Sequence, residues 1–302
     1  MKGDDWMGVL VIGGIIVAAL FGGIKGGSSG SSGGLFDIQN SNPTPSTPQS
    51  QAEIEYKIRE TQYQVENLKR QVQAEEDKKN NSQYFGLVKL GFVNRTTNPS
   101  QEYITMQASF SAGTPILVTG WTVKSLATNV SMTIPKGAYL FFTGMVNAEQ
   151  DIYLEKGETL YLISGVSPVG ASFKSNKCSG YLNQFQTFAP YLNSNCPLPR
   201  NENLTSIPRT VNNDACFDYI DRFPMCRIQT ESLPINWSYE CNNFIYNKIN
   251  YPSCVETHKN DKDFYGAEWR VYLRRTESIW KTSREEIVLY DNVGKVVDTL
   301  KY

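Results

Sequence analysis

The feature that most constrains this chain is a series of β-strand patterns that is interrupted once. Strand-like segments run to Gly165, give way to a cysteine-bearing stretch of about one hundred residues, and resume at Glu268 to finish at Tyr302. Only the part after about Tyr84 has the apolar and aromatic density that a core requires. We therefore expect one β-domain, residues 84–302, with a cysteine-rich insert at about 166–267.

Apolar and polar residues alternate in several of these segments, as they do in strands with one buried face. The alternating sets are Val88, Leu90 and Phe92; Ile104, Met106 and Ala108; and Trp269, Val271 and Leu273, with Arg270, Tyr272 and Arg274 on the opposite face. Turn residues separate the strands at Pro135–Gly137, Lys156–Gly157 and Asp291–Gly294. Short strands with this spacing predict a mainly β fold, an antiparallel β-sandwich.

Five phrases within the β-domain resemble a known family when they are taken in order. They are EYITM (102–106), GWTV (120–123), TIPKG (133–137), LEKGETLYLISG (154–165) and EIVLYDNVGKVVD (286–298). Together they resemble the lamin-tail domain, in its bacterial membrane-anchored type, over roughly residues 84–165 and 268–302. The resemblance implies an immunoglobulin-like β-sandwich and a binding or attachment role. It also implies that Trp121 belongs to a core strand and that Pro135 and Gly137 form the following turn, all three as fold-keeping residues. The insert departs from the family's pattern.

The insert contains every cysteine of the chain. These are the disulfide candidates Cys178, Cys196, Cys216, Cys226, Cys241 and Cys254. Such clustering favours disulfides formed in an oxidising compartment. The phrases CFDYIDRFPMC (216–226) and CNNFIYNKINYPSC (241–254) are similar, and each predicts a short helix that ends at a proline. Their cysteines pair either within each phrase or across the two, and Cys178 then pairs with Cys196 by exclusion.

The N-terminus predicts a transmembrane anchor at residues 1–25. No charged residue occurs from Trp6 to Ile24, and this length matches the hydrocarbon core of a bilayer. The alternative is a cleaved secretory signal, which is disfavoured because Asp4 and Asp5 offset Lys2 and no small-x-small cleavage site follows. We therefore expect a single-pass plasma-membrane protein with a signal-anchor. The cysteines place its C-terminal domain on the extracytoplasmic side.

A linker and a helix follow the anchor. Residues 26–50 are rich in glycine, serine and proline, which are poor core material. Residues 51–80 carry apolar side chains in steps of four and three, at Ile54, Ile58, Val65, Leu68 and Val72 with Thr61 between them. This heptad spacing predicts a coiled-coil helix that joins copies of the chain as a homo-oligomer. The alternative is one amphipathic helix that lies on its own domain.

The sequence gives no pattern for catalysis. We find neither a serine elbow nor a cysteine with a partner histidine, so we expect no enzyme activity, no cofactor and no catalytic residue. His258 follows Cys254 by four residues, but a zinc site needs four ligands, and Glu256, Asp261 and Asp263 do not form a calcium-loop pattern. The formal charge of −1 and the pI near 6.0 indicate no clustered basic surface, so we do not expect nucleic acid as a partner.

Aromatic side chains in the insert offer two interpretations. A stapled insert presents aromatics for binding at little entropic cost, or it uses them as its own small core. The residues in question are Tyr181, Phe185, Phe188, Tyr191, Trp237 and Tyr239.

These patterns lead to one functional expectation with two rivals. We expect a membrane-anchored, non-catalytic module that is displayed on a coiled-coil stalk and binds an unidentified extracellular protein or envelope ligand. The first rival is a structural scaffold that acts by self-association. The second is an extracellular hydrolase with a site in the insert.

Overall fold

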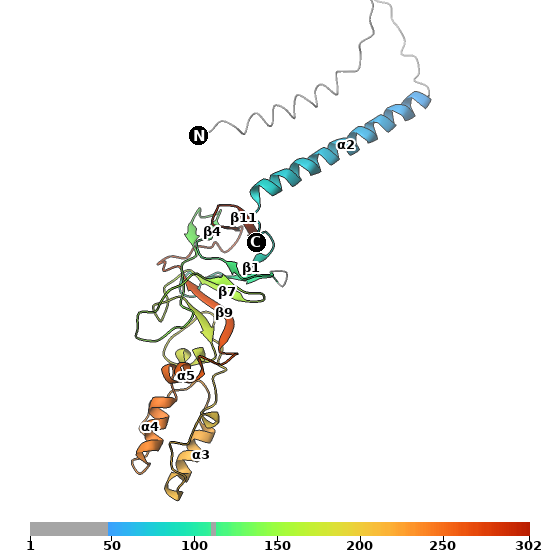
Figure 1. The fold of residues 1–302 in the computed structure, drawn as a ribbon. Coiled ribbons are helices and arrows are strands. Elements are labelled where there is room, and N and C mark those ends of the chain that lie inside the picture. Colours follow the sequence, from blue (N-terminus) through green and yellow to red (C-terminus); the bar gives the residue numbers. More distant parts are fainter. Residues whose placement is uncertain (1–47, 110–112) are drawn as a thin grey trace, which may run out of the picture. The chain divides into compact units, whose positions relative to one another are not determined.

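The computed structural model describes residues 48–109 and 113–302 (Figure 1). The expected anchor at 1–25 and nearly all of the expected linker at 26–50 lie outside these residues. Within the described part, none of the helices combines the length and the apolar character needed to cross a bilayer.

The fold mixes helices and sheets. The helices are α2 (Pro48–Asn80), α3 (Asp214–Arg222), α4 (Tyr239–Lys248) and α5 (Tyr251–His258), with the 3-10 turns η1 (Ser179–Gln184), η2 (Pro199–Asn201) and η3 (Val211–Asn213). The strands are β1 (Val88–Asn94), β2 (Tyr103–Ala108), β3 (Ile116–Leu117), β4 (Thr122–Ser125), β5 (Ser131–Thr133), β6 (Tyr153–Leu154), β7 (Thr159–Ile163), β8 (Phe173–Asn176), β9 (Tyr265–Tyr272), β10 (Glu286–Tyr290) and β11 (Val296–Lys301).

The described strands form two main sheets. One has the order β1-β2-β7-β9-β8, the other has the order β11-β10-β4-β5, and β3 and β6 make a separate pair. Residues from both main sheets share one buried core. It includes Ile104 and Met106 from β2, Trp269 from β9, and Ile287 and Leu289 from β10. The predicted strands with one face in a common core are therefore present.

One pairing differs from the antiparallel prediction. Strands β7 and β9, which lie side by side in Figure 1, are parallel, with Thr159 opposite Glu268 and Ile163 opposite Tyr272. The chain between them leaves the sheet, builds the insert and returns in the same direction. It also contributes β8, which pairs with β9 as an edge strand of the five-stranded sheet. Part of the expected insert thus belongs to the sheet.

The alternation is confirmed in β2 and only partly in β1. Ile104, Met106 and Ala108 are buried, as are Val88 and Leu90, but Phe92 is 63% exposed. The register of β1 against β2 shifts between Leu90 and Val93, so Val93 points into the core in place of Phe92. A bulge inserts one extra residue and reverses the faces beyond it.

The opposite face of β9 was expected to be polar and open, and this expectation is wrong. Arg270 and Tyr272 are as buried as Trp269 and Val271. The insert covers this second face, where Tyr272, Ile163 and Phe173 join a second core with residues of η1, α3, α4 and α5. Arg274, the next residue on this face after Tyr272, is exposed as predicted.

The turns were predicted with mixed success. Turns form at Lys156–Gly157 and at Asp291–Gly294, where Gly157 and Gly294 have φ of +80° and +81°. Residues 135–137 make no turn. Gly137 forms a β-bridge with Gln150, and a side chain at Gly137 would approach the Trp269 ring to 3.0 Å. This glycine permits close packing on the core and does not reverse the chain.

The helix predicted at 51–80 is confirmed as α2, which begins slightly earlier at Pro48. Most of its heptad side chains are exposed, including Ile54, Ile58 and Leu68. An isolated helix gains little stability without a packed apolar face.

Candidate functional site

Three disulfides hold the insert, which is the candidate functional part of the molecule. They join Cys178 to Cys254, Cys196 to Cys226 and Cys216 to Cys241, so every predicted candidate is paired. The expected pair of Cys178 with Cys196 is wrong, and so is pairing within each phrase. One bond does cross between the two phrases, from Cys216 to Cys241.

The local structure explains this pairing. Cys216 lies near the start of α3 and Cys241 near the start of α4, so the two helices meet at their first turns. The first phrase forms one helix that ends before Pro224, as predicted. The second phrase forms two helices. Pro252 starts α5 and does not end a helix, and this carries Cys254 back toward Cys178 beside β8.

Buried polar side chains attach the insert to the sheet. The Arg270 guanidinium on β9 donates to the carbonyl oxygens of Pro190 (2.9 Å) and Tyr191 (3.4 Å), and to the Glu268 carboxylate (2.7 Å). Asn176, at the end of β8, donates to the Tyr251 hydroxyl on α5 at 3.2 Å, and that hydroxyl donates to the carbonyl of Phe141 at 2.8 Å. Buried side chains that are hydrogen-bonded across the contact in this way favour one orientation of the two parts.

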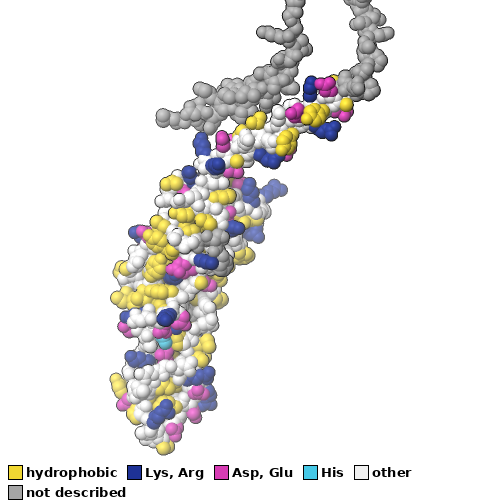
Figure 2. Space-filling model, turned by 45° about the vertical axis from the view of Figure 1, so that its right-hand side comes forward, with side chains coloured by type: hydrophobic (Ala, Val, Ile, Leu, Met, Phe, Trp, Pro, Cys, Tyr) yellow, Lys and Arg dark blue, Asp and Glu magenta, His cyan; other side chains and the backbone are white. Residues whose placement is uncertain are grey.

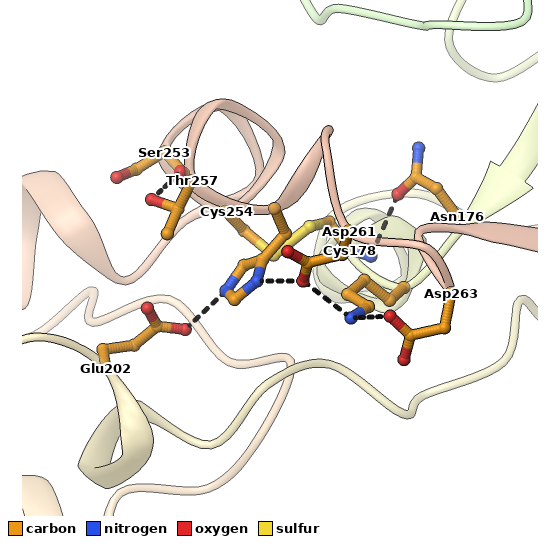
Figure 3. Close-up of polar contacts among 10 residues, drawn as sticks. Asn176, Cys178, Glu202, Ser253, Cys254, Thr257, Asp261 and Asp263 are labelled. Atoms are coloured by element: carbon orange, nitrogen blue, oxygen red, sulfur yellow. Dashed lines mark hydrogen bonds and ion pairs between the residues drawn. A yellow bond between two sulfur atoms is a disulfide. The ribbon is translucent and has the colours of Figure 1, made fainter.

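The most concentrated chemistry of the insert is a row of alternating charges, Glu202–His258–Asp261–Lys177–Asp263, which we call the charged row (Figure 3). His258 at the end of α5 places Nε2 2.9 Å from Glu202 and Nδ1 2.8 Å from Asp261. Lys177 donates to Asp261 at 2.9 Å and to Asp263 at 2.7 Å. The row joins three segments of the insert next to the Cys178–Cys254 disulfide.

Each group in the row favours the charged form of its neighbour. Burial lowers the pKa of His258, but its hydrogen bonds to Glu202 and Asp261 outweigh burial and hold that pKa above its ordinary value. The hydrogen bond to Asp263, followed by that to Asp261, raises the pKa of Lys177 against burial. Lys177 in turn holds the pKa of Asp261 and of Asp263 below the ordinary range. Mutual stabilisation of this kind is typical of ion-pair networks.

This geometry opposes a catalytic role for His258. A general base needs a ring nitrogen free to accept a proton from a nucleophile. Here both nitrogens face carboxylates, which is the arrangement of a doubly donating imidazolium. The charged row is therefore built as a clamp between segments.

The metal sites considered from the sequence do not assemble in the described residues. Cys254 is bonded to Cys178, so its sulfur is not a zinc ligand beside His258. Asp261 and Asp263 contact Lys177, whereas Glu256 pairs with Lys259 at 2.8 Å. In the described part of the chain, no three His, Cys, Asp or Glu side chains are grouped so that they could hold a metal ion.

Two clefts flank the charged row. One, of about 570 Å³, is lined by His258, Lys177 and Asp263 together with asparagines and serines between β8, β9 and η1. The other, of about 350 Å³, is lined by Glu202 and by polar residues of α5. Figure 2 shows the chain's one histidine at the molecular surface next to acidic side chains. Residues of the charged row thus line both clefts.

A third hollow is apolar. This groove, of about 350 Å³, lies between η1 and the loops at 141–144 and 168–169, and none of the described residues that line it is charged. Phe185 stands at its edge and is 60% exposed. Beside the groove, the loop at 142–147 exposes Met145 and Val146.

The Asn147 side chain braces this exposed loop. Its Oδ1 accepts from the Phe142 N–H at 2.7 Å, and its Nδ2 donates to the carbonyls of Phe142 and Met145. Neighbouring exposed apolar side chains, such as Met145 and Val146, are typical of interaction surfaces when they form a contiguous patch. This loop was not predicted from the sequence, because its residues show no periodic pattern of apolar side chains.

The predicted aromatic rim divides between the two interpretations. Tyr181 and Phe188 are buried and belong to the second core, and Trp237 packs against it. Phe185, Tyr191 and Tyr239 are exposed. The core interpretation therefore holds for half of the set.

Comparison of the chain with models of protein families, with curated proteins and with solved structures finds no match.

Proposed function

We propose that this protein is a membrane-anchored, extracytoplasmic and non-catalytic module that binds or attaches to another component of the cell envelope or surface. Its β part is proposed to be an immunoglobulin-like sandwich of the lamin-tail kind, and the insert carries the binding surface. The lamin-tail resemblance rests on the five sequence phrases, and the shared core of the two sheets supports a sandwich.

The observation that carries the proposal is the complete pairing of six cysteines around an insert with its own core. A stapled insert of this kind is typical of domains that fold in an oxidising compartment. The insert also fixes an uncharged groove with Phe185 at its edge, so an apolar partner is captured at small conformational cost. The row around His258 offers no free base, which favours binding over turnover.

The first test is thiol counting on the full-length protein from its native membrane, by alkylation before and after reduction and intact mass. Six blocked cysteines support the extracytoplasmic placement. Six reactive thiols contradict it.

The second test is binding of the full-length protein to isolated cell-envelope material. Replacement of Phe185 by serine removes the exposed ring at the edge of the groove and is expected to weaken binding by about tenfold or more, since exposed aromatic anchors dominate interfaces. Tyr239→Ser, an exposed aromatic that is absent from the groove's lining, is the matched control. Equal binding by wild type and Phe185→Ser excludes the groove as the binding surface.

The second candidate function is a scaffold that assembles through α2. The observation that favours it is the exposure of Ile54, Ile58 and Leu68 at heptad spacing on this helix. Deletion of residues 51–80 distinguishes the two functions. A scaffold loses assembly in this variant, whereas a binding module keeps its monomeric affinity.

A further inference from the structure

The charged row contains one group that changes charge near neutral pH. His258 is the only histidine of the chain, and it bridges two carboxylates that come from different segments. Glu202 follows η2 on the long irregular part of the insert, whereas Asp261 lies in the turn after α5. The imidazole thus stands at the point where these two segments meet.

We propose that the Glu202–His258–Asp261 bridge is a pH-sensitive latch, closed when His258 is protonated, that holds the segment around Glu202 against α5.

The hydrogen bonds of the imidazole show which protonation state of His258 closes the latch. A protonated imidazole donates from both nitrogens, which matches one carboxylate at each nitrogen. A neutral imidazole donates from only one, so the other nitrogen's lone pair then faces a carboxylate oxygen. One of the two contacts becomes repulsive on deprotonation. The latch therefore opens when His258 loses its proton.

The neighbouring charges select which contact opens. Asp261 also accepts from Lys177, whose own charge is held by Asp263, so Asp261 keeps a partner when the imidazole is neutral. Lys248 of α4 and Tyr181 line the same cleft as Glu202. Burial raises the pKa of the Tyr181 phenol to about 12, so this group stays neutral over the pH range of the latch. Glu202 is therefore the contact that is released.

The backbone around Glu202 is able to respond locally. Its N–H bonds within a short turn, to the Pro199 carbonyl at 3.2 Å, and Asn203 and Thr205 bond to each other. Pro199 and Ile207 on either side are buried in the insert. The segment between these two anchors is the part that moves, while the disulfides keep the insert folded.

The direction of the pH effect follows from the hydrogen bonds of the row. The folded pKa of His258 lies above its ordinary value of 6.5. A group with a raised folded pKa contributes its full stabilisation below the unfolded value and loses it as pH rises through the folded value. The latch is therefore closed below about pH 6.5 and opens as the pH rises through the raised folded pKa of His258.

Two NMR measurements on the full-length protein test the latch. The ring nitrogens of its one histidine are followed against pH, and amide hydrogen exchange of Glu202 and Cys254 is measured at about pH 6 and about pH 9 and corrected for intrinsic exchange. The Cys254 N–H is bonded within α5, to the Asn250 carbonyl at 3.0 Å, and serves as the reference. We expect a His258 midpoint above 6.5 and a fall in Glu202 protection of about tenfold or more, with little change at Cys254.

Variants make the test specific. His258→Gln keeps a hydrogen-bonding side chain without the charge, and it should show low Glu202 protection at both pH values. Lys259→Gln removes the neighbouring exposed pair with Glu256 and should behave as wild type. A midpoint at or below 6.5, or equal Glu202 protection in wild type and His258→Gln at about pH 6, overturns the latch.

Discussion

Arg270 lies directly opposite Tyr161 on the neighbouring parallel strand, with its guanidinium carbon 4.1 Å from the centre of the tyrosine ring. The charge is therefore held between the outer face of the sheet and the insert, where its side chain is 1% exposed. A desolvated cation over an aromatic ring is worth about 2 kcal/mol, and the carbonyls of Pro190 and Tyr191 add hydrogen bonds. Arg270 therefore provides a buried polar contact between the five-stranded sheet and the insert.

Replacement of Arg270 by methionine tests this role. The change keeps most of the side-chain volume but leaves buried carbonyls without their donor, so we expect a loss of about 3 kcal/mol in the free energy of unfolding. The measurement is chemical denaturation. Arg274→Met, on the same strand's exposed continuation, should change the free energy by less than about 0.5 kcal/mol. Equal effects of the two changes would show that the hydrogen bonds of Arg270 do not hold the insert to the sheet.

Glu102, which directly precedes β2, makes a second buried contact, with the loop at 279–280. Its fully buried carboxylate accepts from the backbone N–H of Ile279 (2.7 Å) and Trp280 (3.1 Å) and from the Ser164 hydroxyl. We expect Glu102→Ala to cost about 3 kcal/mol, because three buried donors lose their acceptor. Thermal and chemical unfolding check the value. Glu277→Ala, an exposed acid in the same loop, is the control and should be almost neutral.

The disulfides should differ in their contribution. Cys178–Cys254 joins positions 76 residues apart, whereas Cys216–Cys241 joins positions 25 apart. A longer closed loop restricts the unfolded chain more, so paired alanine replacement of Cys178 and Cys254 should cost more within the typical range of about 2 to 5 kcal/mol. The comparison is made by chemical denaturation of each double variant under non-reducing conditions. The reverse ranking would indicate that residual structure or strain, and not loop length, sets these values.

We expect the Asp291 carboxylate to make the stability of the fold depend on pH in acidic solution. Burial disfavours its ionised form, but the Ser82 hydroxyl and the backbone N–H groups of Lys295 and Val293 outweigh burial and hold its pKa below the ordinary 3.8. A lowered folded pKa gives stability that is present above the unfolded value and is lost as pH falls through the folded one. Asp291→Asn should therefore lower the Tm near neutral pH, and the deficit should close as the pH falls below 3.8 and through the lowered folded pKa of Asp291.

Thermal scans against pH measure this difference for Asp291→Asn and wild type. Asp151→Asn changes an exposed carboxylate that is paired with Lys136 at 3.4 Å, and its Tm should follow wild type at every pH. A Tm deficit of Asp291→Asn that stays constant down to the lowest pH would mean that the charge of Asp291 is not involved.

Sequence reasoning was most successful where the physical signal is local. The burial of Ile104 and Met106, the helix over 51–80 and the glycine turns follow from period and from turn chemistry, which neighbouring residues set. Phe92 shows the limit of this reasoning. A one-residue bulge, which no sequence pattern indicates, turns the Phe92 side chain outward and the Val93 side chain into the core.

Long-range relationships were not accessible from the sequence. Arg270 sits at a strand position that reads as solvent-facing, and only the packing of the insert buries it. Cys178 pairs with the most distant cysteine because Pro252 starts α5 and returns the chain to β8. No sequence pattern marks Glu202 or Lys177, because the charged row depends on segments that only folding brings together.

The parallel pairing of β7 with β9 decides how this protein tolerates deletion. Ile163 lies opposite Tyr272, so after β7 the chain must return over at least four residues of strand, roughly 13 Å, before it can pair at Glu268. A tight turn joins antiparallel strands and cannot make this return. Excising residues 166–267 and closing the gap with a short linker would therefore reverse or abolish β9, and with it remove Trp269 from the core. The cysteine-rich stretch is thus a required connection of the fold, and a minimal version of this domain must keep a crossover in its place.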